Sequence, residues 1–427
     1  MPGDKSISHR ALLFGSLADG LVEIEGLGRG GDNVSTARAL EALGVRIEIV
    51  GESARVHGVG LRGFHAAAEA LDCGNSGTTI RLLSGLLAGQ PFATTLRGDA
   101  SLTRRPMRRL AGPLRDMGAT VEGRVDPAKP DEIYPPLTIR GGGLRGISVT
   151  LPVASAQLKS AVVLAALQAQ GASTIVEPGL SRDHTERMLR FMGAPLTADP
   201  TTGTVRVDPT GWSGKLRGGA IRVPGDLSSA AFAIVAALII PGSDVSVEGV
   251  GLNPTRTGVL DALVAMGADL SVEVTGDALG EPVGTVRARA SRLKGTRIDG
   301  ALALRAIDEI PALAVAAALA DGETVFADLR ELRVKESDRI ASIARELGRA
   351  GVSVAEAPDG LRITGVAGNA AGLRGGTVEP MHDHRIAMSG VILGLVAGDE
   401  TTVPAEEIAT SFPTFADTLR GLGATLV

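Results

Sequence analysis

Apolar positions with a helical period recur at nearly regular intervals along this chain of 427 residues. Each such stretch ends in a small turn at a glycine, and a strand-like segment follows. The six glycines are Gly44, Gly118, Gly193, Gly267, Gly351 and Gly423. Glycine commonly ends helices because it adopts the left-handed conformation without strain. The pattern predicts six copies of one structural unit.

A second helix, apolar on nearly every side, is predicted in each copy, and such a helix belongs in a core. These helices are expected to begin near Ser8, Gly77, Ser155, Leu227, Asp308 and His384. The first is expected to run from Ser8 to Ala18, with Ser6 and Ser8 as N-cap residues.

Short alternating segments follow the helices and predict strands. The expected strands are Leu21–Glu25, Arg46–Val50, Val56–Val59, Thr94–Arg97, Thr120–Glu122, Val149–Leu151, Thr174–Glu177, Val205–Val207, Val245–Glu248, Leu270–Val274, Thr324–Ala327 and Leu361–Thr364. Each unit therefore combines a buried helix, an amphipathic helix and several strands, which is an α/β arrangement.

The two halves of the chain echo one another. Pro2-Gly-Asp-Lys-Ser returns as Pro224-Gly-Asp-Leu-Ser, three units later. We therefore expect two similar domains of three units each, residues 4–224 and residues 225–427 plus 1–3. The starts of the buried helices are expected to face a cleft between these domains.

Composition narrows the class of protein. The net charge is -5 and aromatic residues make up only 2%, which argues against a nucleic-acid binder. No apolar run reaches membrane length and no signal peptide is apparent. The single cysteine excludes an internal disulfide and favours a reducing cytoplasm.

Cations stand at the starts of helices that are otherwise apolar. Lys5 and Arg10 flank the first start, and the Gly74–Gly77 turn precedes the second. The helix dipole disfavours cations at an N-terminus, so this repeated placement indicates anionic ligands that offset the cost. A capped helix with solvated charges is the plainer alternative at any single start.

Four other features have simpler readings. The spacing of His382 and His384 is a weak metal signal, and a helix cap is preferred. Cys73 is expected to be a small buried hydrophobe rather than a nucleophile. Asp32 and Asn33 are expected to cap the following helix. Solvated charges are expected at Arg104, Arg108 and Arg109.

Taken together, the motifs resemble those of the 5-enolpyruvylshikimate-3-phosphate (EPSP) synthase family over essentially the whole chain. The motifs are Pro2-Gly-Asp-Lys-Ser-Ile-Ser-His-Arg10, Gly74-Asn-Ser-Gly77-Thr, Gly98-Asp-Ala-Ser-Leu-Thr-Arg-Arg105-Pro-Met, Ser155-Ala-Gln157, Leu332-Arg-Val-Lys-Glu-Ser-Asp-Arg339 and Asp383-His-Arg385-Ile-Ala-Met. Ala156 and Arg182 resemble the class II branch of the family.

The resemblance implies a fold of two domains, each of three βαβαββ units, in an inverted α/β prism that closes over its substrates. It also implies a transferase of the shikimate pathway. Such an enzyme moves the enolpyruvyl group of phosphoenolpyruvate to the 5-hydroxyl of shikimate 3-phosphate and releases phosphate, by addition and elimination through a tetrahedral intermediate. The product serves chorismate and aromatic amino acid biosynthesis.

By resemblance, the shikimate 3-phosphate contacts, which are mainly in residues 4–224, are Lys5, Ser6, Arg10, Ser155, Ala156, Gln157, Arg182, Asp308 and Lys335. The phosphoenolpyruvate contacts are Lys5, Gly77, Arg105, Gln157, Arg339 and Arg385. Asp308 is the expected proton acceptor, Glu336 the proton donor to the methylene, and Lys5 a further proton-transfer group. The resemblance implies no metal and no cofactor, a cytoplasmic monomer, and no nucleic-acid or membrane partner.

Two departures and two alternatives remain. Members usually carry a strand before Pro2, and many have a lysine at the position of Thr410. A transferase of the same fold acting on UDP-N-acetylglucosamine is one alternative, and an essential Cys73 would favour it. A non-catalytic anion-binding repeat protein is the other.

Gly77 implies sensitivity to glyphosate, the family's inhibitor, whereas resistant class II members carry alanine at the matching position.

Overall fold

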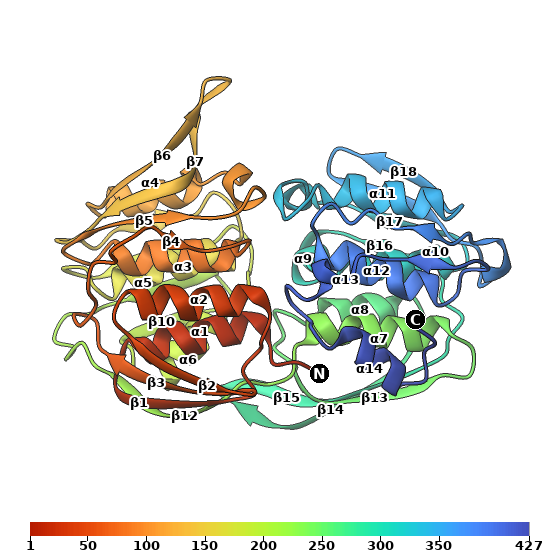
Figure 1. Ribbon diagram of the computed structural model, residues 1–427, viewed down its shortest axis with the longest axis horizontal. Coiled ribbons are helices and arrows are strands. Elements are labelled where there is room, and N and C mark those ends of the chain that lie inside the picture. Colours follow the sequence, from red (N-terminus) through yellow and green to blue (C-terminus); the bar gives the residue numbers. More distant parts are fainter. Residues whose placement is uncertain (427) are drawn as a thin grey trace. The chain divides into compact units, whose positions relative to one another are not determined.

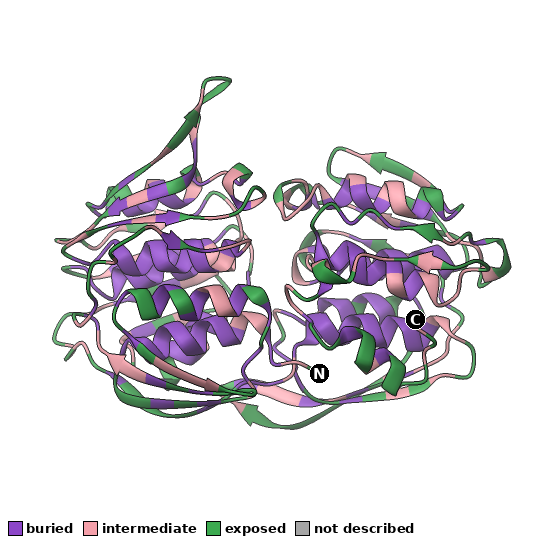
Figure 2. Cartoon of the chain, viewed as in Figure 1, coloured by how far each residue is buried: buried purple, intermediate pink, exposed green. Residues whose placement is uncertain are grey.

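The computed structural model describes residues 1–426, which divide into two compact units. The first unit comprises Lys5–Val223 together with Ala278–Glu281. The second unit comprises the other described residues. Figure 1 colours both along the sequence, and Figure 2 shows that the inner helices of each unit are buried while the strands are partly exposed.

The first unit contains three four-stranded sheets, ordered β12-β1-β3-β2, β4-β5-β7-β6 and β8-β9-β11-β10. Each sheet has one parallel pair followed by two antiparallel pairs. The strands are β1 Ala18–Glu25, β2 Arg46–Val50, β3 Ser53–Val59, β4 Leu71–Asp72, β5 Ala93–Arg97, β6 Thr120–Asp126, β7 Lys129–Arg140, β8 Ser148–Thr150, β9 Ser173–Val176, β10 Leu196–Asp199, β11 Thr204–Val207 and β12 Leu216–Arg222. This common topology is the predicted repeat.

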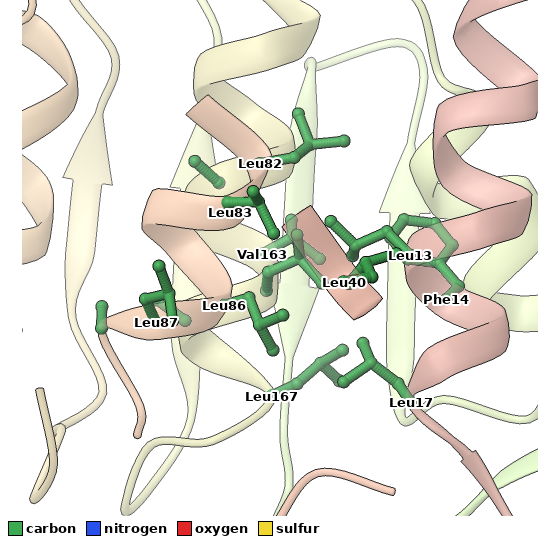
Figure 3. Packing of buried hydrophobic residues seen from close by; sticks show 14 of the residues in the cluster. Leu13, Phe14, Leu17, Leu40, Leu82, Leu83, Leu86, Leu87, Val163 and Leu167 are labelled. Atoms are coloured by element: carbon green, nitrogen blue, oxygen red, sulfur yellow. The ribbon is translucent and has the colours of Figure 1, made fainter. Parts of the chain in front are cut away.

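Three apolar helices form the centre of the first unit. The unit has helices α1 Lys5–Ser16, α2 Gly31–Ala42, α3 Gly77–Leu87, α4 Arg108–Asp116, α5 Ala156–Ala166 and α6 His184–Phe191, and the three at the centre are α1, α3 and α5. Helix α3 contacts both α1 and α5, and Figure 3 shows Leu13, Leu83 and Val163 among the side chains that meet there. All three are almost inaccessible to water, so burial of apolar surface holds these helices together.

The second unit repeats this plan with fewer strands. Its helices are α7 Leu227–Ile239, α8 Gly258–Ala265, α9 Gly300–Arg305, α10 Ile310–Leu319, α11 Arg339–Arg349, α12 His384–Gly394, α13 Ala405–Ile408 and α14 Phe415–Gly421. Its sheets are β13-β15-β14, β16-β17-β19-β18 and β20-β21. The strands are β13 Asp244–Gly251, β14 Asp269–Ala278, β15 Glu281–Arg289, β16 Arg297–Ile298, β17 Glu323–Phe326, β18 Ser353–Ala357, β19 Gly360–Thr364, β20 Gly376–Thr377 and β21 Thr401–Thr402. The apolar helices α7, α10 and α12 contact one another in its core.

The repeat and the fold class predicted from the sequence are confirmed. The six turn glycines all have positive φ, between 84° and 109°. The five later buried helices begin within two residues of their predicted starts. In place of the parallel partner strand seen in the sheets of the first unit, β13 has one parallel bridge, between Val250 and Gly225. Gly225 also forms an antiparallel bridge with Gly3. No helix within residues 1–426 has the length and apolar character needed to cross a bilayer.

The predicted start of the first helix is wrong, because α1 begins at Lys5 rather than Ser8. Ser6 and Ser8 lie inside the helix, and the Ser8 hydroxyl accepts a hydrogen bond from Gly28 N at 2.8 Å. The N-cap of α2 is Gly30, so Asp32 is not a cap.

The sequence reading missed β7, which contains three prolines that argue against a strand. The β6–β7 register shifts between Gly123 and Arg124, which pair with Leu137 and Tyr134. Pro135 and Pro136 lie in this irregularity and have no partner in the ladder. They therefore cost no strand hydrogen bond.

Candidate active site

The first turn of α1 is tied to α2. Lys5 Nζ lies 3.1 Å from Asp32 Oδ2, and Asn33 Nδ2 donates to Lys5 O at 3.0 Å. Asp32 and Asn33 therefore fix the predicted proton-transfer lysine instead of capping their own helix. Lys5 keeps 15% of its side chain accessible.

Arg10 lies one turn further along α1 and is 2% exposed. Its Nη1 donates to Ser6 O at 2.9 Å, its Nη2 to Ser160 Oγ at 2.8 Å and its Nε to Thr185 Oγ1 at 2.7 Å. Ser160 and Thr185 come from α5 and α6. Sequence reasoning missed both hydroxyls, because only the fold brings those helices to Arg10.

Lys159 stands near the start of α5 but is not placed like the other cations. Its Nζ contacts Glu177 Oε1 at 3.0 Å and Glu186 Oε1 at 2.6 Å, and all three side chains are buried. Burial alone would lower the pKa of Lys159, but the charges of Glu186 and Glu177 outweigh it and raise that pKa. Lys159 therefore belongs to a structural ion-pair cluster. That cluster also holds the loop before Arg182, because Glu177 accepts from Ser181 N and Ser181 Oγ.

The turn before α3 is closed by its own polar groups. Ser76 caps the helix and accepts from Thr79 N at 3.1 Å. Arg105 reaches the same turn, because its Nη2 donates to Asn75 Oδ1 at 2.7 Å. Gly77 is the first residue of α3, and its φ is not in the left-handed region. A side chain at position 77 would therefore be limited by space rather than by backbone strain.

The start of α5 contributes the predicted Ser155-Ala-Gln motif. Ser155 is the N-cap and accepts from Leu158 N at 3.4 Å. Gln157 faces α3: its Oε1 accepts from Arg81 Nη1 at 2.8 Å, and its Nε2 donates to Thr78 Oγ1 at 2.9 Å. Nine of the predicted site residues lie in the first unit, namely Lys5, Ser6, Arg10, Gly77, Arg105, Ser155, Ala156, Gln157 and Arg182.

In the second unit, Arg339 is the centre of the predicted site and is 1% exposed. Its Nε lies 2.8 Å from Asp383 Oδ2, its Nη2 2.6 Å from Glu336 Oε2 and its Nη1 3.2 Å from Asp308 Oδ1. The two carboxylates predicted for acid–base chemistry therefore bind one guanidinium group. Asp308, Glu336 and Asp383 come from three loops, each just before the start of a helix: α10, α11 and α12.

The acidic groups around Arg339 change its pKa. Burial alone would lower the pKa of Arg339, but the charges of Asp383, Glu336 and Asp308 outweigh it, and the pKa is raised above its ordinary value. Lys335 Nζ adds a contact of 3.3 Å to Asp308 Oδ1. Arg339 therefore stays a cation throughout the physiological range and orients the acidic groups beside it.

Asp383 also caps α12, as predicted, by accepting from Arg385 N at 3.0 Å. The backbone before it is unusual, since Met381 and His382 have φ of 54° and 62°. These two left-handed residues turn the chain so that Asp383 meets Arg339. His382 is exposed, and its Nδ1 lies 2.8 Å from Glu407 Oε1, so this histidine makes a contact at the protein surface.

Arg256 is a buried group that the sequence reading missed. It is 3% exposed, and it contacts Asp4 at 2.9 Å, Asp226 at 3.1 Å and Glu309 at 3.9 Å. Ser228 Oγ accepts from Arg256 and donates to Glu309. Glu309 is the neighbour of Asp308, so this network supports the loop that carries the predicted base. Nothing in the local sequence around Arg256 indicates this role.

Cys73 is completely buried, as predicted. Burial raises the pKa of its thiol, and the charge of Asp72 adds to this effect. A buried neutral thiol is a poor nucleophile. This environment does not favour the alternative reaction that would need an essential cysteine.

Comparisons with known proteins agree on one family. The family model for EPSP synthase (3-phosphoshikimate 1-carboxyvinyltransferase) matches residues 1–419. A 3-phosphoshikimate 1-carboxyvinyltransferase from Citrifermentans bemidjiense is 51% identical over 99% of this chain and 95% of its own length. One from Gloeobacter violaceus is 52% identical over 98% and 94%.

Solved structures give the same answer. A structure of EPSP synthase from Acinetobacter baumannii is 45% identical, with a TM-score of 0.85, over 99% of this chain and 95% of that chain. Both the sequence and the fold are therefore matched over nearly the full length. The chain described here belongs to the EPSP synthase family.

Proposed function

We propose that this chain transfers the enolpyruvyl group of phosphoenolpyruvate to the 5-hydroxyl of shikimate 3-phosphate, releasing phosphate, in the biosynthesis of chorismate and aromatic amino acids. The observation that carries this proposal is the Arg339 cluster, in which one buried cation holds both Asp308 and Glu336. Family membership supplies the reaction. Asp308 and Glu336, the proposed base and acid, each contact the Arg339 guanidinium group, and this arrangement supports the proposed roles.

The predicted site residues form two sets, one proposed for each anionic substrate. We propose that shikimate 3-phosphate is bound by Lys5, Ser6, Arg10, Ser155, Ala156, Gln157, Arg182, Asp308 and Lys335, and phosphoenolpyruvate by Lys5, Gly77, Arg105, Gln157, Arg339 and Arg385. Guanidinium forks suit carboxylate and phosphate because they bind both oxygens of such a group. Two phosphates and two carboxylates must be bound together, so several cations are required.

The addition step joins the 5-hydroxyl oxygen to C2 of phosphoenolpyruvate. Asp308 accepts the hydroxyl proton, and Glu336 donates a proton to C3, which becomes a methyl group. Elimination then returns a proton from that methyl group to the Glu336 carboxylate, re-forms the C2–C3 double bond and breaks the bond between C2 and the phosphate oxygen. Lys5 is proposed to supply the proton that this leaving oxygen needs. Every step is a proton transfer or a C–O bond change, so this chemistry requires no metal and no cofactor.

Arg339 links binding to this chemistry. It donates to Glu336 and Asp308 in the described structure. An incoming phosphate or carboxylate competes for the same N–H groups, and this competition frees the carboxylates to act on the substrates. Because Asp308 and Glu336 both contact Arg339, which is proposed to bind the substrate, these carboxylates become available for proton transfer only when the substrate is bound.

The remaining expectations are part of the same proposal. The two substrate-binding domains are residues 4–224 and residues 225–427 plus 1–3. The protein acts as a monomer in the cytoplasm. The alternative function, transfer of the enolpyruvyl group to UDP-N-acetylglucosamine, is disfavoured because Cys73 is buried.

Phosphate release measured with purified protein tests the proposal. We expect release only when shikimate 3-phosphate and phosphoenolpyruvate are both present, together with a product whose mass includes the enolpyruvyl group. Replacing shikimate 3-phosphate by UDP-N-acetylglucosamine should give no release. Release with the nucleotide sugar, or none with shikimate 3-phosphate from folded protein, contradicts the proposal.

A further inference from the structure

Arg81 lies in α3 one turn after Gly77, and its side chain folds back to the start of its own helix. It is 7% exposed. Its Nη1 donates to Gly77 O at 3.1 Å and to Gln157 Oε1 at 2.8 Å. One guanidinium nitrogen therefore joins the first turn of α3 to the first turn of α5. Cations at a helix start are disfavoured by the dipole, so this placement needs a functional reason.

The contact with Arg81 sets the orientation of the Gln157 amide. Because Arg81 can only donate, the oxygen of the amide must face it. The nitrogen is then directed to Thr78 Oγ1, which it reaches at 2.9 Å. Without the guanidinium group, the amide could turn over and present an acceptor where it now presents a donor. An anionic substrate distinguishes these two orientations, because it accepts hydrogen bonds and repels an acceptor.

Position 77 acts on the same group. A Cβ added at Gly77 would lie 2.6 Å from Arg81 Nη1 and 2.8 Å from Arg105 Nη1. Both contacts are too close, but both involve the ends of flexible side chains, so the arginines would move and the helix would stay. Alanine is also a better helix former than glycine and its φ is unstrained here. The protein should therefore fold with alanine at 77, while its guanidinium groups are displaced.

We propose that Arg81 is a positioning residue that holds the Gln157 amide for phosphoenolpyruvate and transmits to it the effect of any side chain at position 77. This inference rests on the proposed function, because it assumes that Gln157 and Gly77 bind phosphoenolpyruvate. It assigns Arg81 a role through Gln157 and not a direct step in the chemistry. The effect of a side chain at position 77 on phosphoenolpyruvate binding then depends on how it displaces Arg81, as well as on the free space beside the glycine.

A double-mutant cycle between positions 77 and 81 tests the proposal. Gly77→Ala and Arg81→Met should each raise KM for phosphoenolpyruvate about tenfold, the scale of one hydrogen bond to a charged group, with a smaller change in kcat. The double variant should resemble the more affected single variant, because the displaced group is already gone. KM for shikimate 3-phosphate serves as an internal reference.

Two controls separate this role from a structural one. Arg115→Met removes an arginine that donates to Val121 O elsewhere in the unit. Because Arg115 does not contact Gln157, the fold changes in KM for phosphoenolpyruvate caused by Arg115→Met and by Gly77→Ala should multiply in the double variant. Arg81→Lys keeps the charge but not the fork; it should retain more affinity than Arg81→Met and replaces it if that variant does not fold. Thermal unfolding shows which variants are folded.

The outcomes distinguish this inference from the proposed function. If the unmodified protein releases no phosphate, the proposed function fails. If the unmodified protein is active but the effects of Gly77→Ala and Arg81→Met multiply fully, the function stands and the role of Arg81 is rejected. An unchanged KM for phosphoenolpyruvate in folded Arg81→Met rejects it as well.

Discussion

The carboxylates of Asp4 and Asp226 meet at a single guanidinium group, that of Arg256, at 2.9 and 3.1 Å. Their backbones also pair crosswise, since Asp4 N donates to Pro224 O at 2.8 Å and Asp226 N donates to Pro2 O at 2.9 Å. These contacts explain why Pro-Gly-Asp occurs twice in the sequence. The second copy does not carry a lysine like Lys5, so the echo reflects structure, while the chemistry belongs to the first copy.

Arg256→Met should destabilise the protein by about 3–5 kcal/mol, because it leaves buried carboxylates without their cation. Burial alone would lower the pKa of Arg256, but the charges of Asp4, Asp226 and Glu309 raise it above the ordinary value. Urea unfolding measures the loss. Arg287→Met is the matched control: its partner Asp244 is exposed, so its effect should stay under about 1 kcal/mol. Equal losses in the two variants would contradict the argument.

Asp308→Asn and Glu336→Gln should each lower kcat by about 10²–10⁴-fold, the usual contribution of one acid–base group. Substrate affinity should change much less, because the cations remain. Asp338→Asn is the control, since asparagine can still cap α11 and Asp338 is not part of the proposed chemistry. Steady-state kinetics on folded variants measures both parameters. Near-native turnover in either variant would show that its assigned role is wrong.

Gly77→Ala should reduce inhibition by glyphosate more than it reduces use of phosphoenolpyruvate. The unmodified enzyme should be sensitive, because Gly77 leaves room beside Arg81 and Arg105. Glyphosate is the longer molecule, so it depends more on that room. Inhibition against varied phosphoenolpyruvate measures this, with Gly112→Ala as a control in open space. A resistant native enzyme, or unchanged sensitivity in Gly77→Ala, would count against the argument.

Stability should fall in mild acid because of His9. Burial lowers its pKa well below 6.5, and the charges of Lys5 and Arg10 lower it further. Below about pH 6.5 the unfolded chain therefore binds a proton at His9 that the folded chain does not, and stability is lost at up to about 1.4 kcal/mol per pH unit. Above that pH both states are neutral and the effect vanishes.

Urea unfolding of the unmodified protein and of His9→Gln between pH 8 and pH 5 isolates this contribution. Glutamine can keep a hydrogen bond to Thr36, which His9 contacts at 2.7 Å, but it does not titrate. The difference between the two stabilities should therefore change below pH 6.5 and be constant above it. Parallel curves over the whole range would show that His9 has no such role.

Cys73→Ala should leave turnover within about twofold, because the thiol is buried and its pKa is raised. The native protein should also react slowly with a thiol reagent such as 5,5′-dithiobis(2-nitrobenzoate). Urea-unfolded protein, in which the thiol is accessible, is the positive control. Loss of turnover in a folded Cys73→Ala variant would revive the nucleotide-sugar alternative.

The repeat can be predicted from the sequence, because helix period and turn chemistry are local properties. Gly44 and Gly118 end helices with φ of 95° and 109°, as their position after an apolar stretch predicts. The α/β fold class follows from the same local rules. Membership of the family also rests on local motifs, since residues such as Lys5 and Arg339 stand in short runs that can be read directly.

The partners of the polar groups, in contrast, follow from the packing of distant segments. Lys159 and Lys5 look alike in the sequence, yet Lys159 is buried between Glu177 and Glu186 while Lys5 remains accessible. Arg81 finds Gln157 only because α3 packs against α5. Ion pairs and hydrogen bonds between distant segments depend on packing in three dimensions, and burial determines whether a cation serves stability or a ligand. Local sequence does not encode that burial.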